Sequence, residues 1–206
     1  MKKLVSLIEL PVGRVATAAL MAILWGFFAY RHFIAFQATG EWTYILIGIS
    51  ELAAAVLLAC RSVPETVSVD PVDWLLAINA TFMPLLLSPS SWGVLPIAKN
   101  LIIVASVLQI LGLLSLNRSL ALVAAKRKLK FGGMYRFIRH PLYASYVVMT
   151  TGYVLANSTL MNAFIYFLGL GFLFARMLRE EKHLSHDPAY RAYMQAVPFR
   201  LVPFIV

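Results

Sequence analysis

The stretch Arg139-His140-Pro141-Leu142-Tyr143 lies where a segment dense in lysine and arginine meets an apolar helix. A second polar run, Arg179-Glu180-Glu181, follows the next apolar segment. Proline is favoured in the first turn of a helix, where its missing N–H costs no hydrogen bond, so Pro141 marks a helix start. The two polar runs therefore bracket one apolar helical hairpin and hold charged groups at the edge of an apolar compartment.

The composition indicates a membrane protein. Of the 206 residues, 61% are hydrophobic and only 13% are charged, whereas soluble domains average about 25% charged residues. A soluble chain this apolar would expose large apolar patches and aggregate. We therefore expect a single integral membrane domain over residues 1–206. Residues 1–117 would form an apolar helical half, and residues 118–206 a cytoplasmic loop, a helical hairpin and a tail that together make a cofactor site.

The net charge of +9 does not point to nucleic acid as a partner. The basic residues lie beside apolar segments, where they attract anionic lipid headgroups and fix membrane topology. The expected partners are membrane lipids and a lipophilic or lipid-modified substrate, and the sequence leaves the oligomeric state open. Cys60 is the only cysteine, which excludes an internal disulfide and a thiolate metal cluster. No metal site is predicted.

Six apolar segments are candidates for membrane-spanning helices, which need about 17–25 residues. They cover residues 15–36, 43–60, 72–88, 97–117, 142–157 and 160–177. The predicted fold class is thus all-α, a polytopic membrane helix bundle of about six transmembrane helices. If both termini are cytoplasmic, every lysine and arginine except Arg31 and Lys99 lies on the cytoplasmic side, as the positive-inside rule requires. A five-span arrangement, with the third segment re-entrant or the first lying flat, is the alternative.

The character of the chain changes after residue 177. Residues 177–185 can continue the last apolar helix beyond the membrane surface. Asp187-Pro188 is typical of an N-cap followed by proline at the first helical position. A short helix is therefore predicted at residues 189–196, followed by an extended amphipathic end.

Three polar side chains, those of Glu51, Asn79 and Gln109, lie within predicted spans. An ionised carboxylate in hydrocarbon is costly, so Glu51 must be neutral, paired or turned toward a polar cavity. We expect it to form an interhelical hydrogen bond, and a place in a substrate pocket is the alternative. His32 and His183 lack partners at metal-ligand spacing, and we expect both at the surface or the membrane interface.

The segment from residue 118 to residue 139 is rich in basic side chains, including Lys126-Arg127-Lys128-Leu129-Lys130. This run is typical of a positive-inside anchor, and phosphate binding is the alternative. Gly132-Gly133 permits a sharp bend after it.

The residues around Pro141 have the chemistry of a ligand site. Arg139 and His140 precede a helix N-terminus, whose free N–H groups attract anions, and Tyr135 and Tyr143 offer aromatic rings for stacking. A cationic-aromatic belt at the membrane interface is the alternative. Glu180-Glu181 stands at a helix C-terminus, where the helix dipole disfavours negative charge. An ammonium group or ribose hydroxyls would suit these carboxylates, and a solvated, salt-bridged face is the alternative.

Several motifs in the same order resemble the isoprenylcysteine carboxyl methyltransferase family, and phospholipid N-methyltransferases share parts of the pattern. The resemblance covers about residues 133–205, and it differs from the family at Met134, at Ser145 and at His186-Asp187. The motifs are Gly133-Met134-Tyr135, Arg139-His140-Pro141-Leu142-Tyr143, Glu180-Glu181, Tyr190, Tyr193, Arg200 and Pro203.

This resemblance implies S-adenosylmethionine as cofactor, bound on the cytosolic side by the carboxy-terminal elements. It implies catalytic roles for Arg139, Glu180 and Arg200. It also implies that the cover of the cofactor or the substrate carboxylate site is shaped by Arg139, Tyr190, Tyr193 and Arg200. It implies cofactor contacts from Tyr135, His140, Pro141, Tyr143, Glu180, Glu181, Tyr190 and Tyr193.

The predicted function is methyl transfer from S-adenosylmethionine to a lipophilic acceptor, in the first place a carboxylate of the isoprenylcysteine type. A phospholipid or a small hydrophobic thiol is an alternative acceptor. An NADPH-dependent membrane reductase, with residues 126–130 holding the 2′-phosphate, is a different enzyme that the same motifs allow. A transporter is disfavoured because the chain shows no internal repeat.

Overall fold

The computed structural model describes residues 10–62, 64, 66–120, 122–123, 125–126 and 131–203. Within these ranges the fold is an all-α bundle, as predicted, with one pair of two-residue strands. The helices are α2 (Pro11–Thr39), α3 (Thr43–Ala59), α4 (Pro71–Phe82), α5 (Lys99–Leu116), α6 (Pro141–Ala156), α7 (Leu160–Leu184) and α8 (Pro188–Ala196). The strands are β1 (Thr66–Val67) and β2 (Ala125–Lys126), which pair antiparallel. Short 3-10 turns cover Met83–Leu86, Pro96–Ala98, Asn117–Ser119 and Gly133–Arg136.

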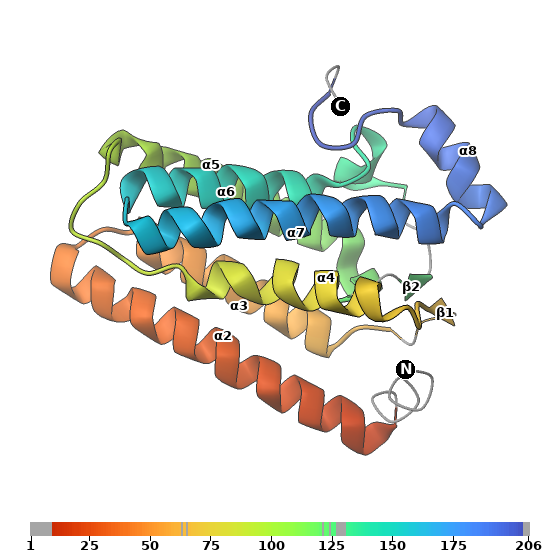
Figure 1. The fold of residues 1–206 in the computed structure, drawn as a ribbon, viewed down its shortest axis with the longest axis horizontal. Helices are drawn as coiled ribbons and strands as arrows, with labels where there is room; N and C mark the ends of the chain where they lie inside the picture. Colours follow the sequence, from red (N-terminus) through yellow and green to blue (C-terminus); the bar gives the residue numbers. More distant parts are fainter. Residues whose placement is uncertain are drawn as a thin grey trace.

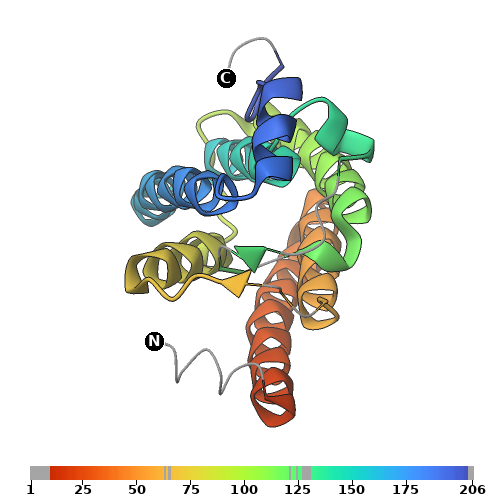
Figure 2. The ribbon, with the colours of Figure 1, turned by 90° about the vertical axis from the view of Figure 1, so that its right-hand side faces the viewer.

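Successive helices from α2 to α7 run in alternating directions along the long axis of the molecule (Figure 1). The start of α2, the strand pair and α8 consequently lie at the same end of the bundle, and the α2–α3 and α6–α7 turns lie at the other. The view along the bundle separates α2 and α3 from α4 and α7 (Figure 2). Direct packing joins α2 to α3, α3 to α5, α5 to α6 and α4 to α7.

Each of the six predicted apolar segments coincides with a helix. The third one is shorter than expected: α4 ends at Phe82, and the chain continues as a 3-10 turn, because Pro84 has no N–H to extend the helical ladder. The other predicted segments match their helices closely, and α7 continues to Leu184, beyond residue 177, as expected.

Among the residues that the structure describes, three helices are long and apolar enough to cross a membrane, and they cover Val15–Thr39, Pro96–Leu116 and Leu160–Leu184. The helices Thr43–Ala59 and Pro71–Leu86 are apolar but shorter. Large side chains such as Ile23 and Phe27 on α2 are more than half exposed, which suits contact with lipid tails. The helices thus form a membrane helix bundle. The number of crossings and the side on which the termini lie stay predictions.

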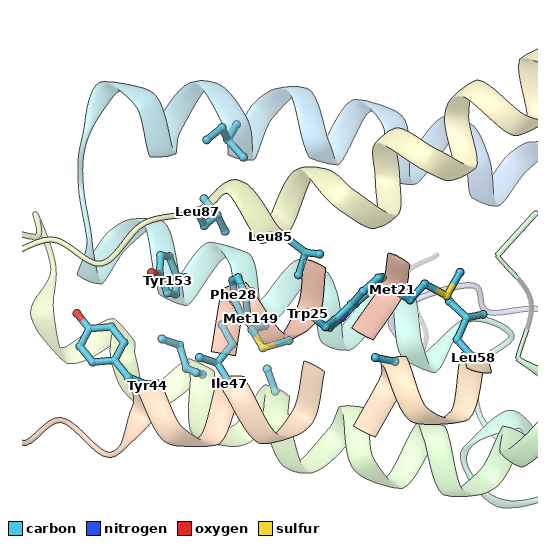
Figure 3. Close-up of a cluster of buried hydrophobic side chains, with 14 residues drawn as sticks. Met21, Trp25, Phe28, Tyr44, Ile47, Leu58, Leu85, Leu87, Met149 and Tyr153 are labelled. Atoms are coloured by element: carbon cyan, nitrogen blue, oxygen red, sulfur yellow. The ribbon is translucent and has the colours of Figure 1, made fainter. Parts of the chain in front are cut away.

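The main apolar core lies between α2, α3 and α6 and the connection after α4 (Figure 3). Met21, Trp25 and Phe28 from α2 pack there with Met149 and Tyr153 from α6. The core also contains the side chain of His32.

His32 is fully buried, with 0% exposure, so the expectation of a surface or interface position for it is wrong. One of its ring nitrogens lies 2.9 Å from the Phe28 carbonyl oxygen, and the other lies 2.8 Å from the Tyr153 hydroxyl. These two partners satisfy the imidazole, which explains how it is tolerated in the core.

Glu51 forms the interhelical hydrogen bonds that the sequence predicted. Its carboxylate accepts from Trp25 Nε1 at 3.1 Å and from Gln109 Nε2 at 3.0 Å, and the residue is 4% exposed. These bonds join α3 to α2 and α5. Asn79 instead donates to the Leu75 carbonyl of its own helix at 2.8 Å.

Two asparagines hold the α4–α5 connection against the α6–α7 hairpin. Asn162 accepts from the Ser88 N–H at 3.0 Å and donates to the Ser88 carbonyl at 2.8 Å. Asn157 accepts from the Tyr44 hydroxyl and from the Ser90 N–H, each at 2.8 Å. The predicted helical hairpin therefore also anchors the connection that precedes it.

We expect Asn162→Ala to lower the free energy of unfolding by about 1–3 kcal/mol, because it leaves the half-buried Ser88 backbone groups without their partner. Asn79→Ala is the matched control, since that side chain bonds within its own helix, and we expect only a small change. Thermal unfolding of the purified variants measures both. Equal stability of the two variants would contradict the anchoring role of Asn162.

Candidate active site

The bend before the Arg139 segment is built on Gly133, as the sequence predicted. Gly133 has φ +60°, in the left-handed region that favours glycine. A Cβ atom at this position would lie 2.3 Å from Ser115 Oγ, so no larger residue fits without a shift. The bend places Tyr135 so that its carbonyl accepts a hydrogen bond from the Tyr193 hydroxyl at 2.6 Å.

The carboxy-terminal tail lies against the start of α6, which begins at Pro141 as predicted. The N–H of Arg139 donates to the Phe199 carbonyl and the N–H of His140 donates to the Arg200 carbonyl, each at 2.9 Å. The Arg139 guanidinium also donates to the Val197 carbonyl at 3.0 Å. Backbone and side chain of one residue thus both bind the tail.

The buried carboxylate of Glu181 joins three chain segments. Oε1 accepts from Arg139 Nε at 2.8 Å and lies 3.1 Å from His140 Nε2, and Oε2 accepts from Arg200 Nε at 2.9 Å. The side chains of Glu181 and Arg139 are each only 6% exposed. A buried charge needs partners of opposite sign and good hydrogen-bond geometry, and here it has both. This network fixes the end of α7, the start of α6 and the tail together.

Glu180, the neighbouring acid, has a different position. Its Oε2 accepts from the Tyr143 hydroxyl at 2.5 Å, and the side chain lines a cavity. The Tyr143 ring stands edge-on to the His140 ring, with 5.1 Å between the centroids. The two adjacent acids therefore have different roles. Glu181 holds the tail, and Glu180 faces the cavity.

The cavity comprises about 1190 Å³ of empty space, part of it open to solvent. Its lining combines charged, aromatic and apolar side chains, so one surface offers contacts both to a polar ligand and to an apolar chain. Its polar mouth is lined by Tyr135, Arg139, His140, Tyr143, Arg176, Glu180, Tyr190 and Tyr193. Its apolar arm is lined by Trp25, Ala54, Leu58, Ala80, Leu142 and Leu173.

Burial keeps the phenols of the polar mouth neutral. Loss of solvation raises the pKa of Tyr193 to about 12, and it raises the pKa of Tyr190 and of Tyr135 further above the ordinary value. Tyr190 and Tyr193 also lie ring to ring, with centroids 5.7 Å apart, and Phe131 stands 4.9 Å from Tyr193. The mouth therefore offers a neutral aromatic wall beside charged groups.

Seven of the predicted site residues line the cavity, namely Tyr135, Arg139, His140, Tyr143, Glu180, Tyr190 and Tyr193. Pro141, Glu181 and Arg200 are not among the lining residues of the described chain. Pro141 sets the start of α6, and Glu181 and Arg200 stand in the network that fixes the tail.

Other lining residues were not singled out from the sequence, among them Thr81, Phe131, Tyr146 and Arg176. The sequence does contain a signal for Arg176. It precedes Glu180 by four residues, and this spacing places two side chains on one face of a helix. The β1–β2 pair was also missed. It ties the segment after α5, from which Leu122 and Ala125 line the cavity, to the chain before α4.

The basic run Lys126–Lys130 lies largely outside the described residues. Lys126 belongs to β2, where it pairs with Thr66. Residues 127–130 are not among those that the structure describes, so neither the anchor nor the phosphate-binding expectation is settled there.

A comparison with protein families bears on the chemistry that this cavity could carry out. Residues 89–190 match the phospholipid methyltransferase family. The matched segment runs from the connection before α5 to Tyr190, and it contains the bend, the start of α6 and both glutamates. Phospholipid methyltransferases and isoprenylcysteine carboxyl methyltransferases belong to one membrane methyltransferase superfamily. The match therefore supports a membrane methyltransferase. A comparison with curated proteins gave no match.

We expect Glu181→Gln to loosen the tail, because the amide leaves the guanidinium groups of Arg139 and Arg200 without a counter-charge. Breaking a buried ion pair from one side costs about 3–5 kcal/mol. Faster tryptic cleavage after Arg191 and Arg200, together with a lower unfolding temperature, measures the effect.

Glu180→Gln is the matched control for this substitution. Its amide oxygen can still accept from the Tyr143 hydroxyl, so the tail should stay docked and the unfolding temperature should change little. If both variants become equally sensitive to trypsin, the division of roles between the two acids is wrong.

Proposed function

We propose that this protein transfers a methyl group from S-adenosylmethionine to a lipophilic acceptor that enters from the membrane. The observation that carries the proposal is that one and the same cavity has a charged, aromatic mouth and an apolar arm. A polar cofactor can bind at the charged mouth while an apolar chain binds in the apolar arm, so each is surrounded by groups of its own polarity.

The donor set of the mouth fits S-adenosylmethionine. The Glu180 carboxylate suits a positive group or ribose hydroxyls, and the rings of Tyr190 and Tyr193 offer an aromatic face for an adenine base. The Arg139 guanidinium and the His140 imidazole suit the carboxylate of an amino acid. When bound, the cofactor would supply an electrophilic methyl group.

The chain's own contribution is to bind, orient and exclude water. Glu181 and the tail hold Arg139 and His140 in place, so these groups need no rearrangement when a ligand binds. Correct orientation of two reactants can supply about 7–11 kcal/mol of a barrier. A carboxylate acceptor, our first candidate, is already a nucleophile, and no general base is needed for it.

The acceptor of this first candidate is of the isoprenylcysteine type. The ordered motifs from Gly133 to Pro203 and the apolar arm support it. The second candidate acceptor is a phospholipid amine, and the family match of residues 89–190 favours it. An amine would have to arrive deprotonated, since its lone pair must be free to attack.

A membrane reductase that uses NADPH is the less supported alternative. Its 2′-phosphate site was expected on residues 126–130, whereas the carboxylate of Glu180 would repel a phosphate at the mouth. Competition between NADPH and S-adenosylmethionine for the purified protein separates the two cofactors.

We expect S-adenosylmethionine to bind the purified protein, and Glu180→Gln to weaken its affinity about tenfold or more, because a carboxylate partner of the cation is lost. Isothermal titration calorimetry measures this. Glu41→Gln is the matched control, since Glu41 pairs with Lys99 far from the mouth, and it should bind as wild type does.

Absence of binding at millimolar cofactor would contradict the proposal. With labelled cofactor, methylation of an S-prenylcysteine or of phosphatidylethanolamine in lipid vesicles then identifies which candidate acceptor is used.

A further inference from the structure

Arg176 lines the polar mouth of the cavity, and Leu173 of the apolar arm lies on the same helix. Arg176 Nη1 donates to Thr81 Oγ1 at 3.0 Å, and the guanidinium carbon lies 5.5 Å from the centroid of the Tyr143 ring. Arg176, Thr81 and Tyr143 all line the cavity. The guanidinium is thus held in place by residues of the same wall.

The charges along α7 follow an order. Glu180 lies at the mouth, Arg176 lies four residues earlier, and Leu173 of the apolar arm lies three residues earlier again. Four residues correspond to about 6 Å along a helix. The wall therefore presents a negative group, then a positive group, then an apolar surface.

Arg176 is not the sole side-chain link between α4 and α7 in the described chain. One turn further along α7, Arg179 already binds α4, because its Nε donates to Asp73 at 2.5 Å and it also pairs with Asp70 at the start of the helix. Arginine within an apolar helix is costly, and where it faces a cavity it marks a binding site. The guanidinium fork binds two oxygens of one anion, such as a carboxylate or a phosphate.

We propose that Arg176 and Thr81 bind an anionic oxygen group of the lipophilic acceptor. The inference rests on the proposed function in that it describes the acceptor of that reaction. The acceptor's apolar chain lies in the arm, its anionic group lies at Arg176, and the positive partner lies at Glu180. The acceptor class is an amphiphile with a carboxylate or a phosphodiester at its polar end, and a neutral thiol or alcohol does not fit.

Binding of a matched pair of amphiphiles tests the proposal without any turnover. The probes are 11-bromoundecanoate and the neutral 11-bromo-1-undecanol, whose bromine quenches tryptophan fluorescence. Trp25 lines the apolar arm, and Trp25→Phe identifies its share of the signal. Wild type should bind the carboxylate at least tenfold more tightly than the alcohol. Equal affinity would overturn the proposal.

Substitutions locate the preference at this wall. Arg176→Met should abolish the preference for the carboxylate and leave the alcohol affinity unchanged, whereas Arg176→Lys should retain part of it. Arg136→Met is the control for general attraction to basic surfaces, because Arg136 is exposed and stacks on Phe137 outside the cavity. A loss of preference in Arg136→Met as large as in Arg176→Met would overturn the proposal.

A second variant keeps the test decisive if Arg176→Met does not fold. Thr81→Val should weaken carboxylate binding about threefold and leave alcohol binding unchanged. If neither Thr81→Val nor Arg176→Lys alters carboxylate binding, the proposal is wrong. Competition by dodecyl phosphate and by dodecanoate then distinguishes a phosphate from a carboxylate as the preferred anion.

Titration of S-adenosylmethionine on the same samples separates this inference from the proposed function. Cofactor binding without a preference for the anionic amphiphile overturns only the inference. A preference for the anionic amphiphile without cofactor binding contradicts only the proposed function.

Discussion

The interaction on which the site depends is the burial of the Glu181 carboxylate between two guanidinium groups and an imidazole. Arg139 and His140 come from the start of α6, and Arg200 comes from the tail. Backbone hydrogen bonds from Arg139 and His140 to the tail accompany this network. A charge with 6% exposure is tolerated only while its partners stay in place. The network therefore makes the docking of the tail a condition for a stable end of α7.

The docked tail gives the cavity its polar mouth. With Glu181 occupied by the tail, the adjacent Glu180 is left to face the cavity, where the Tyr143 hydroxyl orients it. The same wall becomes positive at Arg176 and then apolar at Leu173. Such a gradient suits a cationic polar ligand beside an amphiphile, which is the requirement of methyl transfer at a membrane surface. The match to phospholipid methyltransferases agrees with this requirement.

The helices were predictable because their signals are local. The apolar runs predicted the positions of the helices α2 to α7, although α4 is shorter than expected. Pro141 and Asp187-Pro188 marked two helix starts that the structure confirms. What was not predictable depends on distant partners. His32 is buried because Tyr153 lies beside it in space, 121 residues away in sequence. The β1–β2 pair consists of two-residue strands, which are too short to leave a periodic pattern. The motifs identified Glu180 and Glu181 as a pair. That Glu181 has a different role follows only from its hydrogen bond with Arg200 of the tail, which no local pattern reveals.

Hydrogen–deuterium exchange at the backbone N–H groups of Arg139 and His140 tests the central claim most directly. Both groups donate to tail carbonyls, and both precede the first hydrogen-bonded turn of α6. If Glu181 holds the tail in place, these N–H groups exchange slowly in wild type, and removing residues 198–206 makes them exchange as fast as in an unstructured peptide. Fast exchange in the intact protein would contradict the account.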